Sequence, residues 1–385
     1  MKILLYHWKA YGNRFLCKQL QLLGHEVKEW SNSAVMLDED NSLEAVQKEL
    51  KKGYDLVFSY NYFRILALAC HEAGTPYFAW TQDSPMLSLY DKTTYLETNY
   101  FFCFDYEQYE GLKIRGIEKA FYCPLAVDTE TLEKVSGNCT SGEIRRFGAD
   151  ISFVGSLYSE RNMLSSMDGL PDYVKGYFGA VVEAQLHLPS LRFSNAQIPA
   201  DEMNRIRNYL NFSGTEESKV RYEELVENLI DRDVTVRERS EMMKILSNWK
   251  GFKLFTGSDT SLYPDISNCG TVDYYTEMPK VFQNSKINLN TTLRSIRSGI
   301  PLRILDVIAS GGFLLTDAQP ELFWFFEDGE SLATFQNFEE MEEKIAFYLQ
   351  HETEREKIIR NGRQIVKAKF DYKVRLPEMF KLAGI

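Results

Sequence analysis

The sequence predicts an α/β protein of two domains, each with a parallel sheet covered by helices on both faces. Three observations predict this class. The chain has 385 residues, a length that corresponds to two or three domains. Short apolar runs alternate with amphipathic stretches over the first 130 residues and again after residue 250. A polar segment at residues 131–149 separates the two halves, and its composition is typical of an interdomain linker.

The first half alternates strand and helix patterns in the order of a Rossmann-like domain. The helix patterns stop at Gly24, Gly53 and Gly74, and glycine is the usual residue after a helix C-terminus. We expect helices at residues 13–23, 42–51 and 65–72. We expect strands at residues 3–6, 27–30, 56–59, 77–80, 100–104 and 120–122.

The second half predicts a second α/β domain with a helical insert. A strand is expected at residues 151–154, and residues 160–250 are rich in Glu, Arg, Met and Leu, a composition that favours inserted helices. Further strands are expected at 253–255, 286–289 and 313–316, with a helix at 302–310 and two terminal helices. The domain boundaries that we predict are 1–135, 150–367 with the insert, and a terminal helix at 368–385 that crosses back to the first domain.

Composition and charge exclude several classes of function. The net charge of −11 argues against nucleic-acid binding, which needs a surplus of Lys and Arg. No run of eighteen apolar residues occurs, so we expect no membrane span, and the apolar stretch after Met1 is too short for a signal peptide. The six cysteines show no C-x-x-C pair and no metal-type spacing, which is typical of reduced thiols in a cytoplasmic protein.

The segment at residues 288–317 carries the most chemistry. A strand leads through a polar loop into a helix that begins near Pro301, and a helix N-terminus holds phosphate through its unpaired N–H groups. Gly299 would let a ligand approach the backbone closely. Arg303 in the first turn could grip a pyrophosphate oxygen, and Asp306 on the same face could accept hydrogen bonds from two ribose hydroxyls.

The alternative for Arg303 and Asp306 is an ordinary ion pair on the surface of an amphipathic helix. The apolar residues around the pair argue against it, because they predict a largely buried helix. An arginine and an aspartate on a buried helix need a partner or a ligand. These apolar positions are Leu302, Ile304, Leu305, Val307 and Ile308.

The same segment resembles the C-terminal domain of GT-B glycosyltransferases, in particular the spore-maturation CgeB/YkvP-like group. Residues 285–290, S-K-I-N-L-N, correspond to the group's A-K-I-x-L-N. Residues 299–311, G-I-P-L-R-I-L-D-V-I-A-S-G, correspond to G-x-x-x-R-x-F-E-x-x-A-x-G, and L-L-T-D follows at 314–317. Asn361-Gly362-Arg363, with Tyr372 and Arg375, resembles the closing motif of the group.

Upstream segments are similar to the uncharacterised N-terminal domain that is often fused to this C-terminal domain. Residues 76–85, P-Y-F-A-W-T-Q-D-S-P, contain its Asp-Ser-Pro signature. Residues 104–116, 122–128 and 150–162 match its other motifs, the last being F-V-G-S-x-Y-x-x-R. The resemblance covers nearly the whole chain except the insert, and it is specific for fold and superfamily but not for substrate.

The resemblance implies a metal-independent hexosyl- or related transferase of GT-B fold, whose two Rossmann-like domains face each other across a cleft. It would move a sugar from a nucleotide-diphosphate sugar, bound by the second domain, to a hydroxyl of a protein or glycan acceptor bound by the first. No cofactor or metal is implied, since no D-x-D motif lies in a convincing loop and residues 38–40 are a solvated charge run.

The resemblance also assigns residues to the donor. Asp306 stands where retaining enzymes keep a ribose-binding Glu. Ser298 stands where many keep a second Glu, so either Ser298 or Gly299 would touch the sugar or the phosphate, and retention or inversion stays open. Arg161 matches a basic residue that contacts the diphosphate, the alternative being a solvated arginine, and Gly155 allows close approach in the same loop.

The remaining candidates concern the nucleotide base and the catalytic base. Gly257 and Tyr274 lie where such enzymes place the nucleotide base, and Tyr274 could stack on it or equally belong to the core. Asp83 follows a strand and is the first candidate for activating the acceptor hydroxyl, although it could equally cap the turn at residues 84–85. His7 follows the first strand and is the second candidate, the alternative being a structural histidine.

Two other functions remain open on the same architecture. The carboxylate missing at Ser298 would suit a catalytically degenerate GT-B protein that binds or scaffolds a surface layer. A nucleotide-sugar epimerase is a further alternative, whereas a phosphorylase would need a lysine-bound pyridoxal phosphate, and no lysine stands out for that role.

Overall fold

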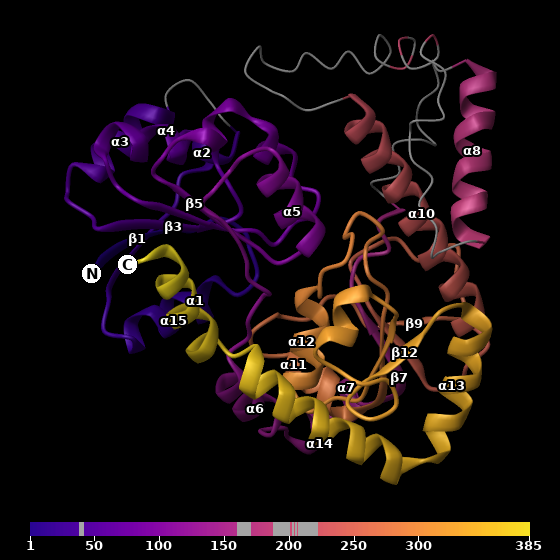
Figure 1. The fold of residues 1–385 in the computed structure, drawn as a ribbon. Coiled ribbons are helices and arrows are strands. Elements are labelled where there is room, and N and C mark those ends of the chain that lie inside the picture. Colours follow the sequence, from indigo (N-terminus) through magenta and orange to yellow (C-terminus); the bar gives the residue numbers. More distant parts are fainter. Residues whose placement is uncertain (38–41, 160–170, 188–200, 202–203, 205, 207–221) are drawn as a thin grey trace.

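The computed structural model describes residues 1–37, 42–159, 171–187, 201, 204, 206 and 222–385. Figure 1 shows two α/β domains, the first in indigo and purple and the second mainly in orange. Arg161 and residues 38–40 lie outside the described residues, so the predictions that concern them have no structural counterpart here.

The N-terminal domain has a six-stranded sheet in the order β2-β1-β3-β4-β5-β6, and all of its described strand pairs are parallel. Its central strands β3 and β4 are buried at every position because helices cover both faces. The strands are β1 Lys2–Tyr6, β2 Glu26–Trp30, β3 Leu56–Tyr60, β4 Tyr77–Trp80, β5 Asn99–Cys103 and β6 Ala120–Tyr122. The helices are α1 Asn13–Leu22, α2 Ser33–Leu37, α3 Ser42–Leu50, α4 Arg64–Ala73 and α5 Tyr106–Ile114, with short 3₁₀ turns at Leu87–Tyr90 and Lys92–Tyr95.

The second domain has a six-stranded parallel sheet in the order β12-β11-β10-β7-β8-β9. Its strands are β7 Ala149–Val154, β8 Phe252–Phe255, β9 Ser267–Asn268, β10 Ser285–Asn290, β11 Leu314–Asp317 and β12 Ala333–Phe335. Its helices are α11 Met278–Asn284, α12 Leu302–Ala309, α13 Phe338–Gln350 and α14 Glu352–Lys369, with a 3₁₀ turn, η5, at Pro320–Trp324. The carboxyl ends of its strands form one edge, where loops and helix N-termini meet.

Two long helices belong to the insert, α8 Asp172–His187 and α10 Tyr222–Leu246. They lie side by side in Figure 1 because an apolar stripe on each faces the other. This stripe consists mainly of Val174, Phe178, Val182, Val226, Ile230 and Val234. The described part of the insert is therefore helical, as the sequence predicted.

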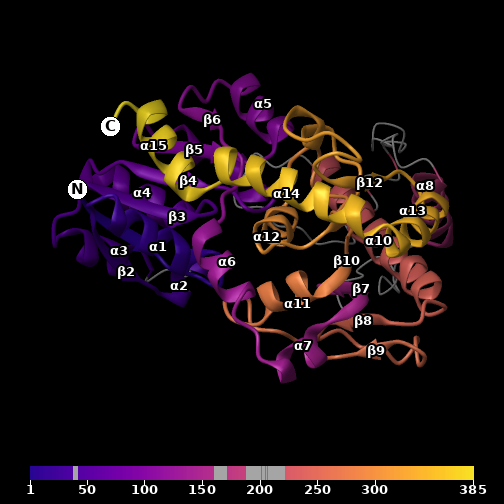
Figure 2. The ribbon, with the colours of Figure 1, turned by 90° about the horizontal axis from the view of Figure 1, so that it is seen from below.

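The last helix, α15 Tyr372–Ala383, lies against α1 in the N-terminal domain. Figure 2 shows α14 running along the second domain toward it. The hydroxyls of Tyr372 and Tyr60 are 2.6 Å apart and both are buried, and Phe380 packs on Phe78. The C-terminal helix thus ties the two domains together through the core of the first.

The predicted fold class is confirmed, and the strand predictions lie within one or two residues of the observed strands. Three local differences have physical causes. The polar segment 131–149 lies mostly in helices α6 Thr129–Ser136 and α7 Ser141–Phe147, which side chains of Asp128 and Thr140 cap. Strands β9 and β12 are too short for a periodic pattern. The end of the chain forms three helices, not two, because His351 and Asp371 start new ones.

Candidate active site

A cavity of about 300 Å³ lies at the carboxyl ends of β7 and β8, and we call it the β7–β8 cavity. Four residues predicted for donor binding line it together, namely Gly155, Gly257, Tyr274 and Arg303. Tyr11 of the N-terminal domain also contributes to the wall. The four predicted residues come from four separate segments of the second domain, which its parallel sheet brings to one edge.

Arg303 lies in the first turn of α12, and its side chain is 24% exposed. The guanidinium stacks over the Phe282 ring at 5.4 Å and contacts the sulfur of Met278. Its Nη1 is 3.9 Å from Oδ2 of Asp306, a long distance for an ion pair. Arg303 therefore has a fixed stem and a cationic end at the cavity, beside the N–H groups that begin α12.

Asp306 is 1% exposed and is not among the residues that line the β7–β8 cavity. Its Oδ1 accepts a 2.9 Å hydrogen bond from the Tyr274 hydroxyl. Burial raises the pKa of Asp306 to about 7, although Arg303 and Tyr274 act in the opposite direction. The Asp306 carboxyl is therefore hydrogen-bonded to Tyr274, and Tyr274 in turn lines the cavity.

Tyr274 belongs to both the core and the cavity wall. It is 7% exposed, and its ring centroid lies 4.9 Å from that of Tyr11, which is 60% exposed at the domain boundary. The sequence left two interpretations of Tyr274 open, a core residue or part of the wall of the nucleotide-base site. The two are compatible in this geometry.

The glycines of the cavity leave different amounts of space. A Cβ built on Gly155 would make only ordinary contacts, 3.4 Å to the Phe153 ring and 3.9 Å to Arg239. A Cβ on Gly257 would lie 3.0 Å from the methyl group of Thr271. No neighbouring atom requires a glycine at position 155, and the missing side chain leaves open space in the cavity. This is typical of a position where a ligand approaches the backbone.

Ser298 and Gly299 lie between the domains and do not line the β7–β8 cavity. The Ser298 hydroxyl is 3.0 Å from Oδ1 of Asp105 and 2.6 Å from Oε1 of Glu321. A Cβ on Gly299 would lie 3.0 Å from both the Cα of Asp105 and the ring of Phe104. In this arrangement both residues have a structural role at the domain boundary. This role differs from the donor contact that the sequence predicted for them.

Glu321 completes this boundary, and no sequence pattern singled it out. It is fully buried and accepts hydrogen bonds from the backbone N–H of Tyr106 at 2.7 Å and the hydroxyl of Tyr122 at 2.6 Å. Burial raises the pKa of Glu321 above its ordinary value. Its partners come from both domains, so their relative position is fixed by buried polar contacts.

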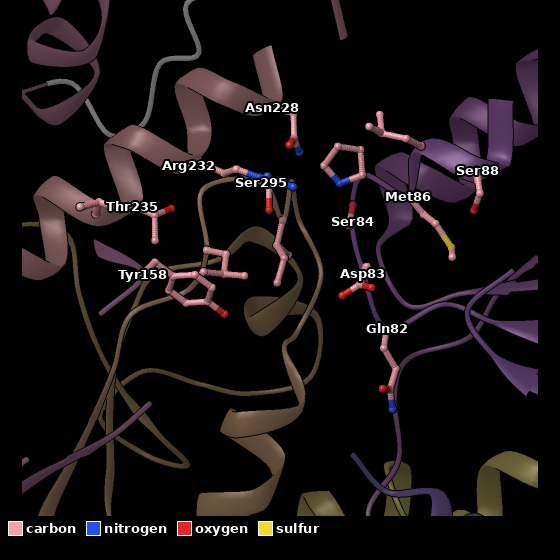
Figure 3. A pocket seen from close by; sticks show the side chains of 15 residues that line it. Gln82, Asp83, Ser84, Met86, Ser88, Tyr158, Asn228, Arg232, Thr235 and Ser295 are labelled. Atoms are coloured by element: carbon pink, nitrogen blue, oxygen red, sulfur yellow. The ribbon is translucent and has the colours of Figure 1, made fainter. Parts of the chain in front are cut away.

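A second cavity, of about 410 Å³, lies between the domains, and we call it the interdomain cavity (Figure 3). Asp83 lines it from the loop after β4. The amide of Asn61 donates a 2.6 Å hydrogen bond to Oδ2 of Asp83, and its oxygen accepts the backbone N–H of Gln82 at 2.8 Å. Asn61 reaches this loop because it follows β3 with a positive φ of 62°, a conformation that Asn tolerates.

The two cavities share a border, the loop after β7. Ser156 lines the β7–β8 cavity and Tyr158 lines the interdomain cavity. His7, in contrast, lines neither of them. Its side chain is 38% exposed at the end of β1, with Nε2 3.8 Å from a carboxylate oxygen of Glu29.

Helix α10 contributes residues to the site that the sequence interpretation missed. Asn228, Arg232 and Thr235 line the interdomain cavity, and Arg239 is buried behind it. One signal could have found them, since positions 228, 232, 235 and 239 recur at i, i+4, i+7 and i+11 on one helix face. The surrounding sequence hid this polar stripe, because Glu and Arg are frequent on every face of α10.

Arg239 joins the loops that border the two cavities. Its Nη1 donates to the carbonyl of Ser156, and its Nη2 donates to the carbonyl of Thr291 at 2.9 Å. The guanidinium also stacks over the ring of Tyr158 at 4.8 Å. Burial lowers the pKa of Arg239. Because this buried cation is held mainly by neutral carbonyls, its positive charge acts on both loops.

Comparisons with known proteins agree with this architecture. Residues 233–381 match the family model described as glycosyl transferase-like, whereas no curated protein matches the chain in sequence. Within the described part of the chain, no helix is long and apolar enough to cross a bilayer.

Three solved structures illustrate the likeness in fold. HepE from Anabaena, in complex with UDP-glucose, is 11% identical with a TM-score of 0.57, and both chains are covered to 100%. A glycosyltransferase from Rickettsia africae is 11% identical with a TM-score of 0.55, covering 99% of this chain and 98% of the other. Sucrose-phosphate synthase from Thermosynechococcus elongatus is 12% identical with a TM-score of 0.54, covering 100% and 98%. Residues 233–381 therefore match the glycosyl transferase-like family, and the chain as a whole has the two-domain GT-B fold.

Proposed function

We propose that the protein is a glycosyltransferase that moves a sugar from a nucleotide-diphosphate sugar to an acceptor hydroxyl. The observation that carries the proposal is the β7–β8 cavity, where Arg303, the start of α12 and the open space at Gly155 meet. A cation and free N–H groups beside uncrowded backbone suit a diphosphate. The structure of HepE with UDP-glucose supports a nucleotide sugar as the ligand class.

The two adjoining cavities suggest how the reaction is divided. The nucleotide diphosphate would lie in the β7–β8 cavity, and the acceptor would enter the interdomain cavity beside Asp83. In the net reaction, the acceptor oxygen bonds to the anomeric carbon while the bond from that carbon to the diphosphate breaks. The electron pair leaves with the diphosphate, which Arg303 and the α12 N–H groups stabilise, and the hydroxyl proton passes to Asp83.

We further propose that positive groups of the chain take the place of a divalent metal at the leaving diphosphate. We also propose that the chain belongs to the CgeB/YkvP-like group and that its acceptor is a protein or a glycan. In the same proposal Asp83, rather than His7, is the catalytic base. Asp306 is then a support for Tyr274 at the donor, and its contact with a ribose would need Tyr274 to move aside.

Thermal shift and calorimetry with UDP, GDP and dTDP and their sugars test the proposal. We expect one nucleotide diphosphate to raise the melting temperature, with or without EDTA. Arg303→Gln should weaken its affinity by about 10- to 100-fold, the usual range for a charge-assisted hydrogen bond. Gly155→Val should weaken it as well, because the larger side chain fills the cavity.

Gly176→Ala is the matched control for the glycine, since a Cβ at this exposed position of α8 meets nothing within 4 Å. The apo melting temperatures of all variants separate lost binding from lost stability. Release of free nucleotide diphosphate from a sugar donor then separates a transferase from a protein that only binds. If no nucleotide diphosphate stabilises the protein at millimolar concentration, the proposal is wrong.

A further inference from the structure

The interdomain cavity contains four polar side chains that have no polar partner in the part of the chain that the structure describes. Ser84 is 5% exposed, and its hydroxyl is buried without a hydrogen bond. Asn228 is 8% exposed, and its amide makes none either. Arg232 and Ser295 complete the set, and Figure 3 shows Asn228, Arg232 and Ser295 gathered on one side of the cavity.

Two of the four side chains, Ser84 and Asn228, are buried, and burial makes a missing hydrogen-bond partner costly. A buried polar group without a hydrogen bond destabilises a protein by about 1–3 kcal/mol. Folded proteins therefore rarely leave them, and those that remain have an explanation in function or in bound water. Asn228 is the buried member whose amide can reach a ligand in the cavity, and the half-buried Ser295 and the exposed Arg232 line the same cavity, which indicates a polar ligand there.

The charge of Arg232 narrows the class of ligand. The neighbouring arginines of the 291–299 loop are each neutralised by a glutamate of α10, Arg294 by Glu238 and Arg297 by Glu227. Arg232, on the same helix, makes no ion pair with any described residue. In a chain with a net charge of −11, an exposed guanidinium without an ion pair at the wall of a cavity favours an anionic ligand.

Resting on the glycosyltransferase function proposed above, we propose that the acceptor carries an anionic group, a carboxylate or a phosphate. This group binds Arg232, with Asn228 and Ser295 as further hydrogen-bond donors. Asp83 lies across the cavity on the loop after β4 (Figure 3), so the acceptor hydroxyl occupies the opposite end. The cavity volume of about 410 Å³ lies within the usual range for a small ligand.

The arrangement also gives the helical insert a function. Arg232 and Asn228 are one turn apart on α10, and α8 packs on the opposite face of that helix. The insert therefore holds a preformed anion site over a cleft whose other wall belongs to the N-terminal domain. Because this anion site lies on the insert, the insert determines which acceptor binds, and it does so separately from the donor cavity.

Three matched monosaccharides test the proposal by calorimetry on the full chain, with and without the nucleotide diphosphate that binds. These probes are glucose, glucose 6-phosphate and glucuronate, which share a ring and differ in charge. We expect at least one acidic probe to bind 10-fold more tightly than glucose, and the two acidic probes distinguish a phosphate from a carboxylate. Arg232→Gln should abolish this preference, whereas Arg232→Lys should keep part of it.

Lys244→Gln is the control variant, because it removes one positive charge from an exposed position on the same helix, outside the cavity. It should keep the preference for the acidic probe. Because Arg232 is exposed, neither of its variants should change the melting temperature, which is measured alongside.

The outcomes separate this inference from the proposed function. Equal affinity for glucose and both acidic probes, no binding of either acidic probe, or a preference that survives Arg232→Gln overturns the anionic acceptor. If a nucleotide diphosphate binds in those cases, the glycosyltransferase proposal still stands. If the acidic preference depends on Arg232 but no nucleotide binds, the anion site stands and the proposed function falls.

Discussion

The hydroxyl of Tyr274 donates a 2.9 Å hydrogen bond to Oδ1 of Asp306, and this bond joins the wall of the β7–β8 cavity to a fully buried carboxyl. It explains how a carboxyl can stand on an apolar helix, since Asp306 has one strong donor and a distant cation. It also makes the cavity sensitive to the protonation of a residue that does not line it.

Asp306 should make stability depend on pH. Burial raises the pKa of Asp306 from 3.8 to about 7 in the folded state, so between these values the folded protein holds a proton that the unfolded chain has lost. The stability that this proton contributes is fully present below about pH 4 and is lost as pH rises through 7. Its slope approaches about 1.4 kcal/mol per pH unit in that window.

The measurement is the melting temperature from pH 4.5 to 8.5 for the wild type and Asp306→Asn. Asparagine is neutral throughout, so the variant should gain on the wild type as pH rises and then run parallel above about pH 7.5. Tyr274→Phe removes a donor that lowers the pKa of Asp306, and it should move the upper end of this window to higher pH. Asp265→Asn controls for the loss of an exposed carboxylate, and parallel profiles for Asp306→Asn and wild type would contradict the prediction.

The fold was predictable because each strand of a covered parallel sheet is a short apolar run closed by a turn residue. The run at Leu56–Tyr60 and the glycine after α4 are typical of this regularity. Helix α7 was not predictable in this way, because its stability depends on the Thr140–Glu143 capping box more than on an apolar stripe. Two-residue β9 exists only through its pairing with β8.

The candidate site was predictable where local sequence determines geometry. Arg303 and Gly155 follow strands of one parallel sheet, so their loops had to meet at its carboxyl edge. The surroundings of Ser298 and Gly299 were not predictable, because Asp105 and Glu321 approach them through tertiary structure from distant segments. For the same reason the sequence pointed to a helical insert but not to α10 as a wall of the cleft.

Ser298→Ala should weaken the boundary between the domains. The substitution removes a hydroxyl that meets Asp105 at 3.0 Å and Glu321 at 2.6 Å, and it leaves two buried carboxyls with one partner fewer. The expected loss in the free energy of unfolding is about 1–3 kcal/mol. Urea denaturation followed by tryptophan fluorescence measures it.

Ser267→Ala is the matched control, because Ser267 is exposed on β9 and its substitution should change stability by less than about 0.5 kcal/mol. Gly299→Ala gives an independent check of the boundary. Its added methyl group must displace the backbone of Asp105 or the ring of Phe104, so it should destabilise the protein as well. A Ser298→Ala variant as stable as Ser267→Ala would show that the hydroxyl contributes nothing to the boundary.

Asp83→Asn should reduce turnover while leaving donor binding intact. Asp83 lines the interdomain cavity, and Asn61 orients its carboxylate with a 2.6 Å hydrogen bond. Asparagine keeps the shape and can still accept from Asn61, but it cannot take the proton of an acceptor hydroxyl. The loss of a general base lowers kcat by about 10²- to 10⁴-fold. Steady-state kinetics of nucleotide diphosphate release, with calorimetry of nucleotide binding, give kcat and affinity separately.

The same assays on His7→Gln decide between the two candidate bases. Asp83 is the better placed, because it lies in the cavity that adjoins the donor along the Ser156–Tyr158 loop, whereas His7 lines neither cavity. Asp265→Asn, an exposed substitution of the same chemistry, controls for the lost charge. A large fall in kcat for His7→Gln with full turnover in Asp83→Asn would assign the base to His7 instead. It would also mean that the acceptor approaches from the end of β1, since a general base must reach the proton that it removes.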